Sequence, residues 1–74
     1  MKQYIVSVIN PVTLDMSIDT PLPVRDAFDL IRQARRNGFE WMLERWVDDG
    51  FAVVQQSAAY DVTEQRAIDT LDTL

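Results

Sequence analysis

The chain has 74 residues, with 12 acidic and 7 basic side chains, a formal net charge of −5, and neither cysteine nor histidine. Without cysteine it forms no disulfide and has no thiolate nucleophile, and without both residue types it has no Cys/His zinc site. Nucleic-acid-binding domains usually carry a basic surface, so the negative charge argues against that class. A chain of this length is expected to form one small domain over residues 1–74.

The N-terminal segment carries one apolar run, from Tyr4 to Ile9. This run is too short for a signal peptide or a transmembrane helix. By elimination we expect a cytoplasmic protein.

Two strands are expected at the start of the chain. Residues 3–9 are rich in β-branched and aromatic types, with apolar side chains at both odd and even positions, a pattern typical of a central strand covered on both faces. An Asn-Pro pair then interrupts the strand. From Thr13 to Asp19 apolar and polar residues alternate, which predicts a half-buried edge strand antiparallel to the first.

The period then changes to that of a helix. Apolar residues recur every three or four positions and predict an amphipathic helix running to about Asn37, with Pro23 suited to its first turn. Gly38 is a favourable stop because glycine adopts positive φ at no steric cost. The expected apolar stripe consists of Val24, Ala27, Phe28, Ile31 and Ala34.

The next segment has two interpretations. In the first, Val47 to Gly50 forms a type I turn with Gly50 in the left-handed conformation, and residues 51–57 return as a second strand. Trp41 then shares the face covered by the main helix with Phe51 and Val53.

In the second interpretation, residues 39–49 form a helix that Asn37 caps and Gly50 ends. Composition favours this helix, because Glu, Met, Leu and Arg are good helix formers. The very short connection after Gly38, and the need of residues 51–57 for a strand partner, favour the hairpin, which we prefer.

A short helix is expected at the C-terminus. Asp61 is a candidate N-cap, and Glu64 would complete a capping box. Its apolar stripe would be Ala67, Ile68, Leu71 and Leu74. The predicted fold is therefore α+β, with a small antiparallel sheet, elements in the order β-β-α-β-β-α, and the main helix packed on one face.

The hairpin places Trp46, Met42 and Val54 on the face away from the main helix, where the last helix alone could hide them. Exposed apolar patches of this kind mark partner sites or dimer interfaces, and tryptophan is a frequent hot spot. The competing interpretation is that the C-terminal helix covers these residues as part of the core.

Charged residues give weaker candidates. Arg25, Arg32 and Arg36 share one side of the main helix and suit either an acidic partner or a solvated face with ion pairs to Asp29. The acidic residues suit either imitation of nucleic-acid phosphates or an ordinary surface. No catalytic residue, metal site or cofactor site is expected. The candidate partner-binding residues are Trp46, Met42, Val54, Asp48, Asp49, Arg32 and Arg36.

The order of predicted elements, with strands over 3–9 and 13–19, a helix over 24–37 and a hairpin over 39–57, resembles several small phage-encoded inhibitors. Some anti-CRISPR proteins of type I systems are among them. The resemblance covers most of the chain, rests on layout and size, and implies a protein that blocks a larger complex. The leading hypothesis is a non-enzymatic protein-binding inhibitor; the alternatives are a homo-oligomeric structural or regulatory protein and a nucleic-acid-binding module using the helix arginines.

Overall fold

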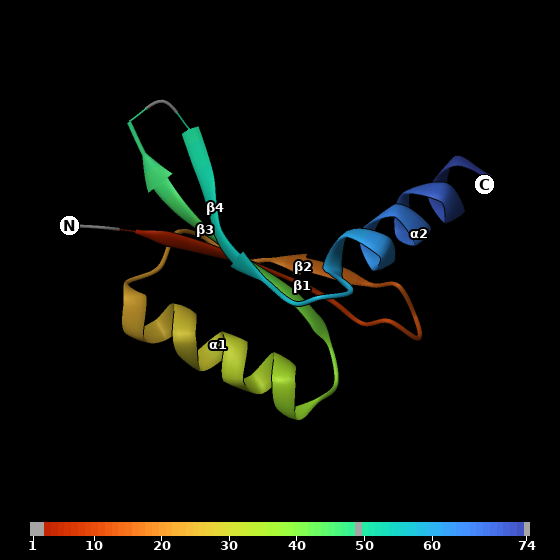
Figure 1. The fold of residues 1–74 in the computed structure, drawn as a ribbon, viewed down its shortest axis with the longest axis horizontal. Helices are drawn as coiled ribbons and strands as arrows, with labels where there is room; N and C mark the ends of the chain where they lie inside the picture. The colour runs from red at the N-terminus through yellow and green to blue at the C-terminus, as the bar shows by residue number, and fades with distance from the viewer. Residues whose placement is uncertain (1–2, 49, 74) are drawn as a thin grey trace.

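The computed structural model describes residues 3–48 and 50–73. Its four strands form one antiparallel sheet in the order β2-β1-β3-β4, joined by two helices (Figure 1). The predicted α+β class, element order and hairpin are confirmed, and the helical alternative for residues 39–49 is wrong. The elements are β1 (Tyr4–Ile9), β2 (Met16–Ile18), α1 (Val24–Arg36), β3 (Glu40–Val47), β4 (Gly50–Gln56) and α2 (Tyr60–Asp72).

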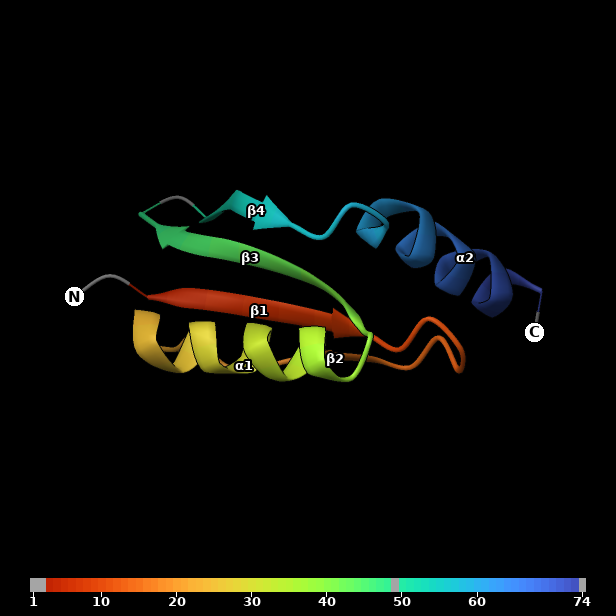
Figure 2. The ribbon, with the colours of Figure 1, turned by 60° about the horizontal axis from the view of Figure 1, so that its bottom comes forward.

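The two helices lie on opposite sides of the sheet (Figure 2). We call these sides the α1 face and the α2 face. As predicted, β1 is an inner strand covered on both faces, with Val6 buried toward α1, and Ile5 and Ile9 buried toward α2. The core on the α1 face consists of Val6, Ala27, Ile31, Ala34, Trp41 and Leu43.

α1 ends where the sequence predicts, through a pair of backbone hydrogen bonds around a glycine. The N–H of Phe39 donates to the carbonyl of Ala34 at 2.8 Å, and the N–H of Gly38 donates to the carbonyl of Arg35 at 3.2 Å. This is the Schellman arrangement, which satisfies the last carbonyls of a helix and needs positive φ at the residue after the cap. Gly38 supplies it, with φ of 71°.

The buried stripe of α1 is narrower than the predicted one. Ala27, Ile31 and Ala34 are buried, whereas Val24 and Phe28 are exposed. α1 packs on β1 and β3 through Ala27, Ile31 and Ala34, and Val24 and Phe28 lie beside these positions on the helix rather than among them.

β2 is shorter and more exposed than predicted for residues 13–19. The side-chain oxygen of Asn10 accepts hydrogen bonds from the N–H of Val12 and of Thr13, so these residues form a turn. Leu14 follows with φ of 64°, and the strand begins only at Met16. β2 is an antiparallel edge strand as predicted, but its three residues are exposed, because both helices pack mainly on β1 and β3.

The register of the hairpin corrects the predicted faces. Val47 pairs with Gly50 and Trp46 pairs with Phe51. Because directly opposed residues of an antiparallel pair project to the same face, Phe51 lies on the α2 face with Trp46. The prediction that Phe51 shares a face with Trp41 is wrong, since a loop of two residues pairs odd positions of β3 with even positions of β4.

α2 begins earlier than the predicted capping box. The N–H of Thr63 donates to the carbonyl of Ala59 at 3.0 Å, so Ala59 occupies the N-cap position and Asp61 lies inside the first turn. The cap predicted at Asp61 is wrong, because packing of Tyr60, which is only 1% exposed, starts the helix before it.

The buried side of α2 covers only its first two turns. Tyr60, Thr63 and Ala67 are buried, while Ile68 and Leu71 are exposed, which contradicts the predicted stripe. Leu74 lies outside the described residues. The described residues beyond Ala67 are all exposed, and α2 extends away from the sheet (Figures 1 and 2).

Candidate functional site

The largest aromatic side chains on the α2 face meet near the hairpin turn. Trp46 and Phe51 lie directly opposite each other on β3 and β4, with ring centroids 4.4 Å apart and ring planes at 73°. This edge-to-face contact stabilises the pair. Even so, 49% of Trp46 and 46% of Phe51 remain exposed.

Two valines of β4 extend this apolar surface. Val53 pairs with Glu44, while Gln55 pairs with Leu43, so Val54 is an extra residue in β4 and forms a β-bulge. Val53 therefore lies on the α2 face, and its predicted place beside Trp41 is wrong. Both valines are more than half exposed. We call Trp46, Phe51, Val53 and Val54 the tryptophan patch.

The tryptophan patch stays uncovered because of the direction of α2. The helix packs on β1 and β3, starts near the end of the sheet where β1 ends and β3 begins, and runs away from the hairpin turn (Figures 1 and 2). The molecule is accordingly long and thin, with extents of 40 × 29 × 19 Å. Apolar side chains near the hairpin turn are therefore exposed to solvent. Apolar side chains in the last turns of α2 are exposed as well.

A polar cluster lies where α2 meets the sheet. Burial raises the pKa of the Tyr60 hydroxyl to about 12; a hydrogen bond with Ser7 opposes part of that rise, and the negative charges of Glu64 and Glu44 add to it. The phenol is therefore neutral at physiological pH. Both carboxylates lie close to Tyr60 on the α2 face.

The charges of the two helices differ in sign. α2 carries four acidic residues, Asp61, Glu64, Asp69 and Asp72, against the single basic residue Arg66. α1 carries four arginines, Arg25, Arg32, Arg35 and Arg36, against Asp26 and Asp29. The α2 face is consequently the acidic side of the molecule.

The candidate partner-binding residues do not form one site. Met42 lies on the α2 face with Trp46 and is partly buried, and Asp48 is exposed at the hairpin turn. Asp49 lies outside the described residues. The remaining candidates belong to α1, on the other side of the sheet.

Arg32 and Arg36 project from the outer side of α1, away from the sheet. The guanidinium of Arg32 donates to the carboxylate of Asp29 at 2.8 Å. A surface ion pair with Asp29 is one of the two interpretations of Arg25, Arg32 and Arg36 drawn from the sequence. Phe51 and Val53 were missing from the predicted set because their face was assigned wrongly.

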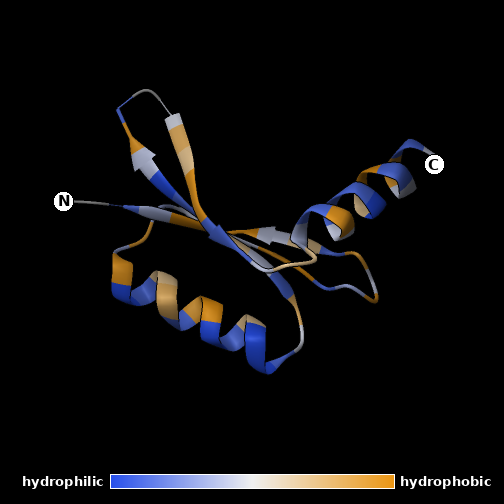
Figure 3. Ribbon diagram, viewed as in Figure 1, coloured by the Kyte–Doolittle hydropathy of each residue, from blue (hydrophilic) through white to orange (hydrophobic). Residues whose placement is uncertain are grey.

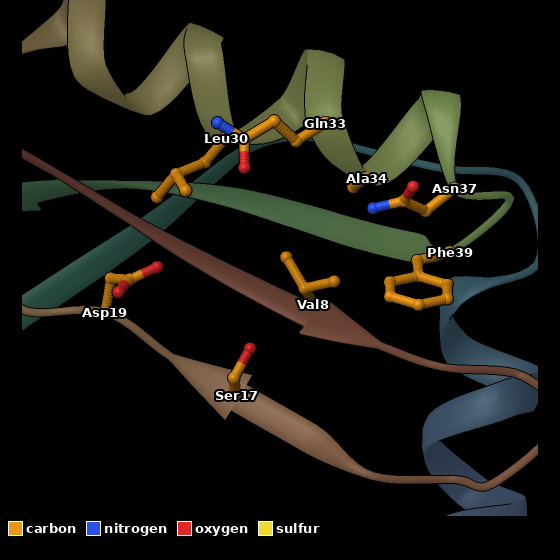
Figure 4. A pocket seen from close by; sticks show the side chains of 8 residues that line it. All are labelled: Val8, Ser17, Asp19, Leu30, Gln33, Ala34, Asn37 and Phe39. Atoms are coloured by element: carbon orange, nitrogen blue, oxygen red, sulfur yellow. The ribbon is translucent and has the colours of Figure 1, made fainter.

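A shallow hollow lies on the α1 face between α1 and β2 (Figure 4). It exists because the small side chain of Ser17 points into the space beside α1, which packs over β1 and β3. Its volume of about 160 Å³ is below the range of about 300–1,000 Å³ usual for small-molecule sites. It is lined by Val8, Ser17, Asp19, Leu30, Gln33, Ala34, Asn37 and Phe39.

Within residues 3–48 and 50–73, no three acidic side chains gather closely enough to hold a metal ion. No helix in the described part of the chain is long and apolar enough to cross a membrane. No family model, curated protein or solved structure matches the chain.

Proposed function

We propose that this chain is a non-enzymatic protein-binding module that contacts its partner through the tryptophan patch. The observation that carries the proposal is the exposure of Trp46, Phe51 and Val53 side by side on the α2 face. Contiguous apolar patches on small proteins usually mark interaction sites, and buried tryptophan dominates the energy of many interfaces.

The charge of the α2 face specifies the chemistry of the partner. Glu44 and Glu64 lie beside Tyr60 on this face, and α2 is acidic along its length. A partner with a basic rim around an apolar contact would be attracted from solution and oriented by these charges. Arginine and lysine side chains of the partner would pair with the carboxylates.

The resemblance to small phage-encoded inhibitors gives the proposal its specific form. Such a protein would act in the host cytoplasm and block a larger complex, a CRISPR effector for example, by occupying an assembly or substrate contact. No chemistry is required of the inhibitor, because steric occupation of the site is sufficient.

The test is affinity purification from a host lysate followed by binding to the purified partner. Trp46→Ala is expected to weaken binding by about 2 kcal/mol or more, roughly 30-fold in Kd. Met42→Ala should weaken it less, because Met42 is partly buried and lies four residues from Trp46 along β3 on the same face. Ile18→Ala is the matched control, because Ile18 is an exposed apolar residue on the same face but on the opposite edge strand.

Two results would contradict the proposal. One is the recovery of no stoichiometric partner from any plausible host lysate. The other is a partner whose affinity falls equally for Trp46→Ala and Ile18→Ala, since the contact would then not centre on the tryptophan patch.

A further inference from the structure

The sequence of β4 does not suit its place in the sheet. Phe51, Ala52, Val53 and Val54 are apolar in succession, the pattern of an inner strand covered on both faces. β4 is nevertheless an edge strand, and its residues 51–55 are all exposed. Figure 3 shows the hydrophobic colour of β4 beside the hairpin turn. The inner strand β1 has a similar apolar composition, but its residues are mostly buried.

The outer edge of β4 has less protection than that of β2. The strand is seven residues long and contains neither a charge nor a proline, two common means of preventing edge-to-edge pairing, and its one protective feature is the β-bulge at Val54, which leaves Gly50 to Val53 regular. The other edge strand, β2, has three residues with Asp15 and Asp19 beside it. Both helices pack mainly on β1 and β3. The β2 edge is therefore protected against further pairing, whereas the β4 edge can pair with another strand.

We infer that β4 pairs with β4 of a second copy of this chain, antiparallel and centred on Ala52, to make a two-fold symmetric dimer with one continuous sheet. In this register Phe51 lies opposite Val53 of the second copy, and the reverse pair follows from the symmetry. Cross-strand pairs of an aromatic with a β-branched residue are among the stabilising ones. The pairing uses β4 up to Val53 and avoids the extra residue Val54.

The neighbours on β3 support this register. Trp46 lies beside Phe51 and Glu44 lies beside Val53 within one chain. Across the two-fold axis each tryptophan, phenylalanine and valine would therefore join a single apolar cluster on the α2 face. Two tryptophan patches become one.

Charge favours a second copy over a foreign strand. The segment used in the pairing, Phe51 to Val53, carries no charged side chain, so two copies place no like charges opposite each other there. A foreign strand selected for this edge would need charged or pocket-forming side chains on β4 to recognise, and the sequence from Gly50 to Gln56 offers none. Self-pairing requires only that the strand match itself.

The inference is independent of the proposed function, because edge pairing leaves the α2 face open to a partner. A dimer that binds no other protein would support the inference and contradict the proposed function. A monomer that binds a partner through Trp46 would do the reverse.

The test places a charge on the axis without harming the monomer. Ala52 is exposed and pairs with Arg45 of its own chain, so Ala52→Glu forms a favourable cross-strand pair there. In the dimer the two new carboxylates would face each other, and Kd should rise roughly fivefold or more. Ile18→Glu adds the same charge to the other edge strand and should leave Kd unchanged. Sedimentation equilibrium measures Kd, and circular dichroism checks folding.

A mixing experiment makes the test specific to the register. Ala52→Lys should also weaken the dimer, whereas an equimolar mixture of Ala52→Glu and Ala52→Lys should form a heterodimer tighter than either homodimer. The inference is overturned if the unmodified chain is monomeric up to millimolar concentration. It is also overturned if Ala52→Glu and Ile18→Glu have the same Kd, or if the mixture shows no preference for the heterodimer.

Discussion

The two tryptophans offer a direct comparison between the core and the surface of one hairpin. Trp41 is 5% exposed and packs in the core on the α1 face, with the guanidinium carbon of Arg35 5.3 Å from its ring centroid. Trp46 is five positions later on the same strand and is half exposed on the α2 face. Shortening each side chain should therefore destabilise the fold by very different amounts.

The expected magnitudes follow from buried area. A fully buried tryptophan removes up to about 250 Å² from water, which at about 25 cal/mol/Å² gives an upper value near 6 kcal/mol. For Trp41→Ala we expect about 4–5 kcal/mol, including the cavity that remains. For Trp46→Ala we expect about 1–2 kcal/mol, because half of the side chain is already hydrated, water fills the vacated space, and mainly the contact with Phe51 is lost.

Urea denaturation followed by far-ultraviolet circular dichroism measures both values. A chain of 74 residues is expected to have a free energy of unfolding of about 4–11 kcal/mol, so the loss from Trp41→Ala ranges from somewhat under half of the stability to all of it. The milder pair, Trp41→Phe and Trp46→Phe, keeps the comparison measurable. We expect a loss of about 2 kcal/mol for Trp41→Phe and about 0.5 kcal/mol for Trp46→Phe.

Equal losses for the two phenylalanine variants would refute the reasoning, as would a larger loss at Trp46. Either result would mean that the α2 face near the hairpin turn is covered in solution. The proposed functional role of the tryptophan patch in the isolated chain would then fail with it.

Three further predictions concern single groups. Gly38→Ala should cost about 1–2 kcal/mol in unfolding free energy from backbone strain alone, because φ is 71° and an added Cβ meets no described atom within 4 Å. Gln33→Ala, at an exposed position of α1 with helical backbone, should cost nothing comparable. Burial raises the pKa of Tyr60 from 10.0 to about 12. The free energy of unfolding that this shift contributes, about 2–3 kcal/mol, is therefore fully present below pH 10 and is lost between pH 10 and about 12. Tyr60→Phe should remove this component of the stability profile, and an unchanged profile would contradict the assigned burial. Arg32→Ala breaks the exposed pair with Asp29 and should change stability by less than about 0.5 kcal/mol in thermal unfolding, a larger loss meaning that the pair is not simply solvated.

Local signals predicted much of the fold. The period of apolar residues from Val24 to Ala34 and the stop at Gly38 define α1 to within one residue of its observed end. The short connection at Gly38 and the need of residues 51–57 for a neighbouring strand correctly favoured a hairpin over a helix, although the composition of the segment favoured the helix. These features depend on backbone preferences within a few residues, which a sequence displays directly.

The same sequence misled at β2 and in α2. Alternation predicted a strand through Leu14, but the side chain of Asn10 binds the following backbone and keeps that segment in a turn. At α2 a plausible cap at Asp61 lost to the packing of Tyr60 against the sheet. At β2 the hydrogen bonds of the Asn10 side chain outweighed the strand preference of the alternating residues. At α2 the burial of Tyr60 outweighed the capping preference of Asp61.

The sequence by itself determined the class of the protein, the order of its elements and the exclusion of cysteine and histidine chemistry, because these depend on composition and on short-range backbone preference. Only the tertiary structure decided which side chains of the hairpin share a face and where α2 stops covering the sheet. The reason is that strand register is a long-range property in which a shift of one residue moves every side chain to the other face. The tryptophan patch and the exposed strand β4 exist because of that register and the direction of α2.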